Sequence, residues 1–219
     1  IHVSFGMVSV KDNFLGTSAK LSTREGNVIF LNDVLEKSVE KTLEIINERN
    51  SSLENKEEIA KEVGIGAVIF QELFNTRIKD YSFDWNNVLN FEGETGPYVQ
   101  YSAARANSIL EKNDFYLKLD NIDISKVSNY KMNIDELSLI KSIYKFEDIL
   151  LDSAKKYEPS ILARYITEVA KLFNKFYNSC PISNQEDSVK EFRLILTYCT
   201  RLLIEIGLGL LGMDTPKKM

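Results

Sequence analysis

Helical periodicity limits the fold of this chain more than any other feature of its sequence. Beyond residue 32, apolar residues recur at spacings of three and four, and the alternation typical of strands is almost absent. Strand-like sequence is confined to residues 2–9 and the short run 27–31. The predicted fold class is therefore mainly α, a helical bundle beside a small α/β remnant. We expect at least six helices, over about residues 33–46, 56–79, 97–112, 133–146, 147–157, 159–177 and 188–207.

Capping signals set several of the expected helix ends. Asn133 with Glu136, and Ser188 with Glu191, have the spacing of a capping box, in which two side chains satisfy free backbone N–H groups at a helix start. Gly207 stands where glycine often ends a helix. We therefore expect helices to begin close to residues 133 and 188, and the second of them to end at Gly207.

Proline and glycine add two further constraints. Pro97 predicts a helix start, because its missing N–H would be unpaired there in any case. Gly64 and Gly66 fall inside the helix expected over residues 56–79, where each costs about 1 kcal/mol relative to alanine. They indicate either a break in that helix or close packing against another backbone.

The composition excludes several classes of protein. With 44% hydrophobic and 27% charged residues the chain has the balance of a globular domain, and its apolar runs are far shorter than a membrane span requires. Cys180 and Cys199 lie on apolar helical patterns, so we expect buried thiols in a reducing cytoplasm rather than a disulfide framework. His2 is the only histidine, and no metal site is predicted.

Charge is divided unevenly along the chain, whose net charge is −5. Residues 1–96 carry 10 Lys and Arg against 16 Asp and Glu, whereas residues 97–219 carry 17 against 16. Bulk attraction therefore does not favour a nucleic acid. Any RNA binding has to rest on local basic clusters and stacking aromatic side chains.

The segment SAKLSTREGN, residues 18–27, has the composition of an anion-binding loop. Lys20 and Arg24 flank hydroxyl side chains, and Gly26 lets the backbone turn tightly, so the loop is suited to stabilise charge on a polyphosphate. It does not match a Walker loop, which requires G-x-x-x-x-G-K-[ST]. The alternative is a solvated basic loop without a ligand.

A second candidate site is aromatic. Tyr98, Tyr101 and Arg105 share one face of the helix expected after residue 97. With the amide of Gln100 they are suited to stack on, and hydrogen-bond with, unpaired RNA bases. The alternative is that the tyrosines pack within the bundle and leave their hydroxyls at its edge.

Asn174 and Tyr177, in the segment FNKFY, allow the same two interpretations. The neighbouring Phe173 and Phe176 indicate a helix that faces the core, which favours packing.

The carboxylates of Asp80 and Asp84 lie around Tyr81 and Trp85 at an expected helix end. A pair of carboxylates is compatible with acid–base catalysis. A structural cap or salt link is the interpretation that we favour here.

Together these stretches resemble the C-terminal part of arginyl-tRNA synthetase, a class I aminoacyl-tRNA synthetase. The resemblance covers essentially the whole chain. AKLSTREGN is similar to the second ATP-binding signature of the family, the K-M-S-K-S loop, and the block ending in GPYVQYSAAR is the most specific. The similar blocks, in family order, are HVSFGMV (2–8), AKLSTREGN (19–27), VGIGAV (63–68), DYSFDW (80–85), FEGETGPYVQYSAAR (91–105), FNKFY (173–177) and GLGLLGMDTPKKM (207–219).

The chain also departs from the family pattern. Leu21 replaces the usual methionine of the loop, and Thr23 stands where the general signature has its second lysine. The first ATP signature of the family, H-I-G-H, has no counterpart here. Because the chain also begins with Ile1 rather than methionine, we expect a C-terminal fragment that is inactive alone.

The resemblance implies a division of the chain and a set of roles. Residues 1–33 would end a Rossmann-type catalytic domain, residues 34–96 would form a helical connection that contacts the tRNA stem, and residues 97–219 would form the helical anticodon-binding domain. The parent enzyme would use ATP with Mg²⁺ to attach arginine to arginine tRNA, as a monomer without membrane contact and with no cofactor expected on the fragment. The implied catalytic residues are Lys20, Ser22 and Arg24; those binding ATP are Lys20, Leu21, Ser22, Thr23 and Gly26; those binding tRNA are Tyr98, Gln100, Tyr101, Arg105, Asn174, Tyr177 and Met219.

Two other classes of function stay open at this point. One is a free-standing helical RNA-binding module without catalysis, although such a module has no need of the loop around Lys20. The other is a helical scaffold without RNA affinity. Filter binding of arginine tRNA separates the scaffold from the other two.

Overall fold

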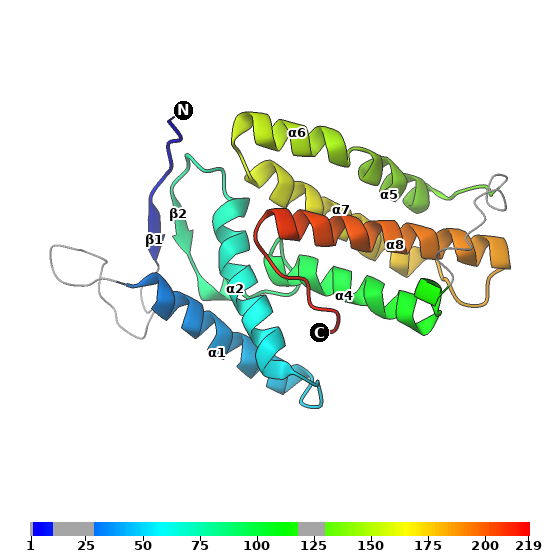
Figure 1. Ribbon diagram of the computed structural model, residues 1–219, viewed down its shortest axis with the longest axis horizontal. Coiled ribbons are helices and arrows are strands. Elements are labelled where there is room, and N and C mark those ends of the chain that lie inside the picture. Colours follow the sequence, from blue (N-terminus) through cyan, green and yellow to red (C-terminus); the bar gives the residue numbers. More distant parts are fainter. Residues whose placement is uncertain (1, 11–28, 118–129) are drawn as a thin grey trace.

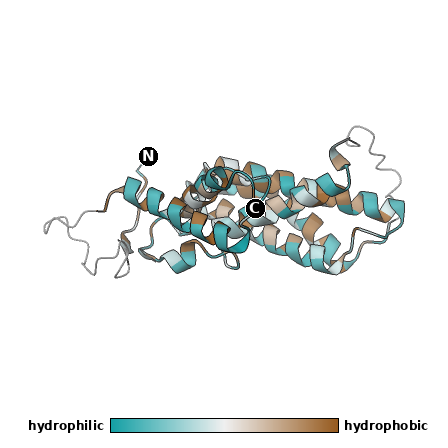
Figure 2. Ribbon diagram, turned by 90° about the horizontal axis from the view of Figure 1, so that it is seen from below, coloured by the Kyte–Doolittle hydropathy of each residue, from teal (hydrophilic) through white to brown (hydrophobic). Residues whose placement is uncertain are grey.

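The protein is mainly helical, as the periodicity predicts (Figure 1). The structure, a computed structural model, describes residues 2–10, 29–117 and 130–219. Figure 2 shows hydrophilic and hydrophobic residues alternating along the helices, as expected for helices that each bury one face. In chain order the elements are β1 (Val8–Val10), α1 (Leu31–Arg49), α2 (Lys56–Phe74), β2 (Tyr81–Phe83), α3 (Trp85–Val88), α4 (Gly96–Lys112), the 3₁₀ turn η2 (Phe115–Leu117), α5 (Ile134–Tyr144), α6 (Phe146–Lys156), α7 (Ser160–Ser179) and α8 (Asp187–Leu210).

The two strands form a small parallel sheet, with Val8 opposite Tyr81. The sequence patterns did not predict β2, and the helix expected over residues 56–79 ends earlier, at Phe74. A strand of three residues carries almost no local signal, and its hydrogen-bond partner lies more than 70 residues away in the chain. Of the run 27–31, the structure describes residues 29–31, which form no strand, and Leu31 already begins α1.

Helices α1 and α2 form a hairpin beside the sheet (Figure 1). Gly64 lies where the two helices are closest: a Cβ there would be 2.9 Å from the carbonyl oxygen of Ser38. The hydroxyl of Ser38 in turn donates to the carbonyl oxygen of Gly64. Helix α2 continues through both glycines, so close packing, rather than a break, explains Gly64.

The main core lies among α4, α5, α7 and α8 and the second half of α2. Helix α7 contributes most to this core, and the prediction that it faces the core is confirmed. Its large apolar side chains at most 4% exposed are Leu162, Ile166, Val169, Phe173 and Phe176. This bundle positions the exposed faces of α4 and α7.

The first predicted capping box is confirmed. Asn133 accepts from the backbone N–H of Glu136, and the Glu136 carboxylate accepts from the N–H of Asn133 at 2.8 Å. The second box is wrong, because α8 begins one residue earlier, at Asp187, and has no side-chain cap bond at its start.

Gly207 does not end α8, which runs on to Leu210. A Cβ on Gly207 would lie 2.5 Å from Cγ2 of Ile166, so this glycine permits close contact with α7. The glycine that follows the helix in a left-handed conformation is Gly212, with φ of +77°.

Cys180 is buried and Cys199 half-buried, and both are free thiols, in agreement with their apolar patterns. Burial raises the pKa of the Cys199 thiol. Within the part of the chain that the structure describes, no helix has both the length and the apolar character to cross a lipid bilayer.

Candidate nucleic-acid interface

A cleft of about 570 Å³ lies between the α1–α2 hairpin and α4. One wall of the cleft is apolar and comes from the hairpin, through side chains such as Ile46 and Ile59. The opposite wall carries most of the residues predicted to bind RNA. Five of the seven line it together: Tyr98, Tyr101, Arg105, Asn174 and Met219.

The guanidinium of Arg105 lies over two aromatic rings. Its Cζ is 4.8 Å from the ring centroid of Tyr101 and 5.3 Å from that of Tyr177, which belongs to α7. The two tyrosines are 37% and 41% exposed. The three side chains thus form an aromatic and cationic surface that remains open to solvent, the combination that single-stranded nucleic acid favours.

Asn174 of α7 forms hydrogen bonds that fix the position of this surface. Its Oδ1 accepts from Nη1 of Arg105, and its Nδ2 donates to the hydroxyls of Tyr98 (3.0 Å) and Ser102 (2.9 Å). The amide is therefore used in contacts with three residues of α4. Such contacts fix the position of Arg105 and leave Asn174 itself little capacity to read a base.

Gln100 lies apart from the cleft. Its side chain is fully buried, and its Nε2 donates to the backbone carbonyls of Glu62 (3.3 Å) and Asp214 (2.8 Å). A buried amide with these partners cannot reach a base in this conformation. The helical spacing from Tyr98 to Arg105 could not reveal this, because Gln100 faces α2 and the C-terminal segment rather than the shared face.

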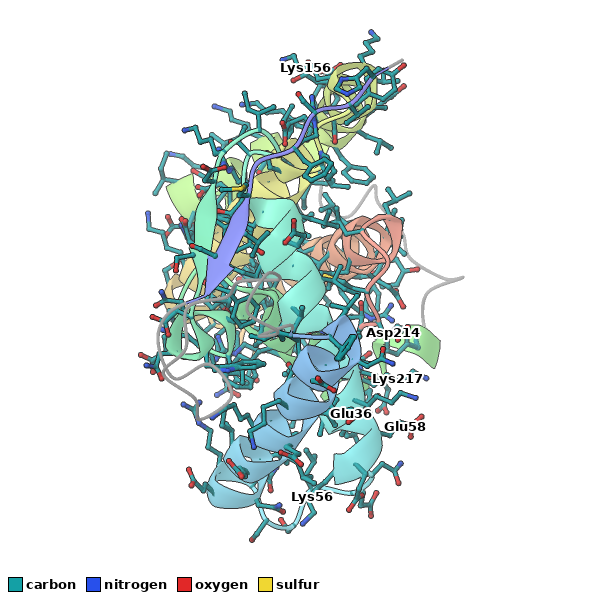
Figure 3. All side chains as sticks on the ribbon, turned by 90° about the vertical axis from the view of Figure 1, so that its left-hand side faces the viewer. Glu36, Lys56, Glu58, Lys156, Asp214 and Lys217 are labelled. Carbon is teal, nitrogen blue, oxygen red and sulfur yellow. The ribbon has the colours of Figure 1, made fainter. Side chains whose placement is uncertain are left out.

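The C-terminal segment contributes Met219 to the lining of the cleft. Gln100 bonds to it at Asp214, and two helical turns further along α4 Asn107 donates to the carbonyl of Lys217 at 3.2 Å. Figure 3 shows Asp214 and Lys217 on the same side of the molecule as Glu58 of α2. Met219 then packs against the apolar cluster of the hairpin.

The carboxyl group of Glu62, in α2, has a raised pKa. Its burial and the nearby Asp214 carboxylate cause this shift.

Two residues that the sequence patterns did not single out also line the cleft. Arg49 is the last residue of α1, and its guanidinium lies 5.1 Å from the ring centroid of Phe91. Phe91 opens the block FEGETGPYVQYSAAR, a signal that could have drawn attention to it. Arg49 lies in a polar stretch that predicts only a helix end, so its role depends on tertiary contacts.

The pair Asp80 and Asp84 has the structural role that we favoured. Oδ1 of Asp80 accepts from the backbone N–H of Met7 at 2.6 Å, which ties the approach to β1 to that of β2. Asp84 caps α3 by accepting from the N–H of Asn86 at 3.1 Å.

The predicted ATP loop lies outside the described residues. The roles of Lys20, Leu21, Ser22, Thr23, Arg24 and Gly26 therefore stay predictions.

Two family models match the chain. Residues 99–219 match the DALR anticodon binding domain, and residues 1–85 match the catalytic domain of "tRNA synthetases class I (R)". The predicted boundaries at residues 33 and 96 are not tested by these matches and remain predictions.

Curated relatives are similar over the whole chain. An arginine–tRNA ligase of Halothermothrix orenii is 51% identical over 221 residues, and one of Clostridium kluyveri is 50% identical over 220 residues. In both cases the alignment covers 100% of this chain and 37% of the relative. The chain thus spans little more than a third of the length of these proteins.

Solved structures share the fold. The arginyl-tRNA synthetase of Thermus thermophilus superimposes with a TM-score of 0.82 at 29% identity, over 97% of this chain and 34% of that one. The arginyl-tRNA synthetase of Plasmodium falciparum gives a TM-score of 0.78 at 25% identity, over 88% of this chain and 34% of its own.

Proposed function

The chain belongs to the DALR anticodon binding domain family, and from this premise we propose that it binds the anticodon arm of arginine tRNA. The cleft between α4 and the α1–α2 hairpin is the proposed site. Tyr101, Arg105 and Tyr177 would stack on unpaired bases, and Tyr98 and Met219 would shape the cleft around them. Asn174 would act by holding Arg105, and we leave the buried Gln100 out of the proposed contacts.

The observation that carries this proposal is that the positive charge of Arg105 has no counter-ion. Within the described part of the chain Arg105 forms no ion pair with a carboxylate, and its guanidinium lies over two half-exposed tyrosine rings. A half-buried cation without a counter-ion favours an anionic ligand, and exposed aromatic rings beside it favour bases. Unpaired RNA supplies both.

A second part of the proposal concerns the whole protein to which this anticodon binding domain belongs. We propose an arginine–tRNA ligase that acts as a cytoplasmic monomer and uses ATP with Mg²⁺, as the similarity of residues 1–85 to a class I catalytic domain supports. That similarity also favours a ligase over a free-standing RNA-binding module. In this scheme Lys20 and Arg24 would neutralise charge on the phosphates of ATP, and Ser22 and the backbone of Gly26 would help to position them.

Filter binding tests the RNA proposal directly. We expect this chain to retain arginine tRNA, with affinity that falls steeply as salt rises, and to bind less tightly when the anticodon is altered. Equal affinity for the altered tRNA would contradict anticodon recognition. Absence of binding even at low salt would favour a helical scaffold.

A second assay concerns catalysis. The 219 residues contain no H-x-G-H sequence, so we expect this chain alone to show no arginine-dependent exchange of pyrophosphate with ATP. Exchange above background would show that the loop around Lys20 suffices without that motif, contrary to the proposal.

A further inference from the structure

We propose that Arg49 and Phe91 form a phosphate subsite for the RNA strand whose bases lie on Tyr101 and Tyr177. The inference rests on the proposed function and adds a contact from a different part of the chain. Arg49 and Phe91 both precede residues 99–219, the range that matches the anticodon binding domain. The subsite thus assigns an RNA-binding role to the α1–α2 hairpin.

The stacking geometry leaves the donors of Arg49 available. Its guanidinium lies over the half-buried ring of Phe91, 5.1 Å from the centroid. An arginine held over a ring keeps a fixed position, while its N–H groups point outward in the guanidinium plane. Two such groups, side by side, match two oxygens of a phosphate.

The positive charge of Arg49 also has no counter-ion among the described residues. Among residues 2–10, 29–117 and 130–219, no carboxylate forms an ion pair with it, although its half of the chain is rich in Asp and Glu. The described contacts give it only the Phe91 ring. A structural role at the C-terminal end of α1, where a cation offsets the helix dipole, is the alternative that an experiment has to exclude.

Arg49 and Arg105 line the same cleft from its two walls. Arg105 is half-buried, and Asn174 uses one of its donors, so it is suited to a base that enters the cleft. Arg49 is exposed, and its ring partner is half-buried. An exposed cation opposite a stacking surface suits the RNA backbone, which runs along the outside when bases point inward.

The test is the salt dependence of tRNA binding by Arg49→Gln. We expect affinity for arginine tRNA to fall roughly tenfold, and the slope of log K against log salt to become shallower by about 0.7 to 0.9, the effect of one lost phosphate contact. The loss should be equal for tRNA with the native and with the altered anticodon, because a phosphate carries no sequence information.

Three variants sharpen this result. Arg49→Lys should keep the salt slope but lose part of the affinity, since lysine keeps the charge without the planar donors. Phe91→Leu should likewise keep the slope and weaken binding by about two- to fivefold. Arg164→Gln is the control. Arg164 also lies over a phenylalanine, Phe74, without a carboxylate partner in the described structure, but it does not line the cleft, and its guanidinium donates to the carbonyl of Phe74 and the hydroxyl of Thr76. This variant should bind like the unsubstituted chain.

The outcomes separate this inference from the proposed function. If the unsubstituted chain binds tRNA and Arg49→Gln keeps its affinity and slope, the subsite is wrong and the proposed function stands. A loss confined to one anticodon sequence would also overturn it, since Arg49 would then read a base. If the unsubstituted chain binds no tRNA at all, the proposed function fails and the subsite fails with it.

Discussion

Arg193 and Arg105 both lie among helices next to tyrosine side chains, yet their surroundings differ in one decisive respect. Nε of Arg193 is 2.7 Å from Oε1 of Glu136, and its other donors reach the hydroxyl of Tyr130 and the carbonyl of Pro181. Arg193 is 9% and Glu136 0% exposed. Arg105 instead bonds to a neutral amide.

The difference shows how one residue type serves two purposes. A buried charge has to be paired, and the pair formed by Arg193 and Glu136 joins α5 to α8 inside the fold. An arginine held by a neutral amide keeps its full charge for an external anion. Arg193 is therefore expected to matter for stability, and Arg105 for binding.

The largest expected effect comes from breaking the buried pair. Arg193→Met leaves the Glu136 carboxylate buried without its partner, so we expect the free energy of unfolding to fall by about 3–5 kcal/mol. Urea unfolding followed by circular dichroism measures it. The double variant Glu136→Gln with Arg193→Met should recover part of the loss, and a loss of less than about 1 kcal/mol from the single change would show that the pair is not a stabilising contact.

Arg105→Gln should have the opposite effect, with a large loss of tRNA affinity and little change in stability. It removes the cation from the two tyrosine rings, so we expect tRNA affinity to fall about 10- to 100-fold, with unfolding free energy changed by less than about 1 kcal/mol. Filter binding and urea unfolding on the same preparation measure both quantities. A variant that unfolds easily while binding tRNA normally would reverse the assignment of the two arginines.

Asn174→Asp would make the two clusters alike. The new carboxylate would lie against Nη1 of Arg105 and neutralise it, as Glu136 does for Arg193. We expect tRNA binding to weaken roughly three- to tenfold. Asp has nearly the shape of Asn but lacks the Nδ2 donor to the hydroxyls of Tyr98 and Ser102. Asn174→Ala, which loses the same donor without adding a charge, is therefore the control and should weaken binding less. Unchanged affinity of Asn174→Asp would mean that the charge of Arg105 does not contribute to binding.

The smallest expected effect concerns Asp135, the neighbour of Glu136. Hydrogen bonds from Lys175 and Ser179 lower the pKa of Asp135 below its ordinary value of 3.8. A lowered folded-state pKa stabilises the fold above the unfolded-state pKa, and this contribution is lost as the pH falls through the folded-state value. The stability difference between the natural chain and Asp135→Asn should therefore shrink from pH 7 to pH 3. A difference that is constant over this range would contradict the pKa shift.

Local patterns predicted the helices well because the signals are contained within a few residues. Asn133 and Glu136 lie three residues apart and cap α5 as expected. Ser188 and Glu191 have the same spacing, but α8 starts one residue earlier, with Asp187 in its first turn, where a carboxylate suits the helix dipole. The pattern located this helix start to within a residue but not its cap.

For two glycines, too, the local sequence predicted only part of the structure, and tertiary contacts decided the rest. The sequence limited Gly64 to two possibilities, and only the contact with Ser38 of α1 selected one of them. Gly207 has the local character of a helix end, yet α8 continues through it because Ile166 of α7 occupies the space that a side chain would need. The residue that explains each glycine lies more than 20 positions away, beyond the reach of any local pattern.

The candidate site also combines features that the sequence predicted with features that only the packing of the helices decided. By itself the sequence determined that Tyr98, Tyr101 and Arg105 share a helix face, because helical periodicity is a property of neighbouring residues. Only the tertiary structure decided that Gln100 is buried, that Tyr177 joins Arg105, and that Arg49 enters the same cleft. These placements depend on how separate helices pack, and packing is set by contacts between residues far apart in the chain.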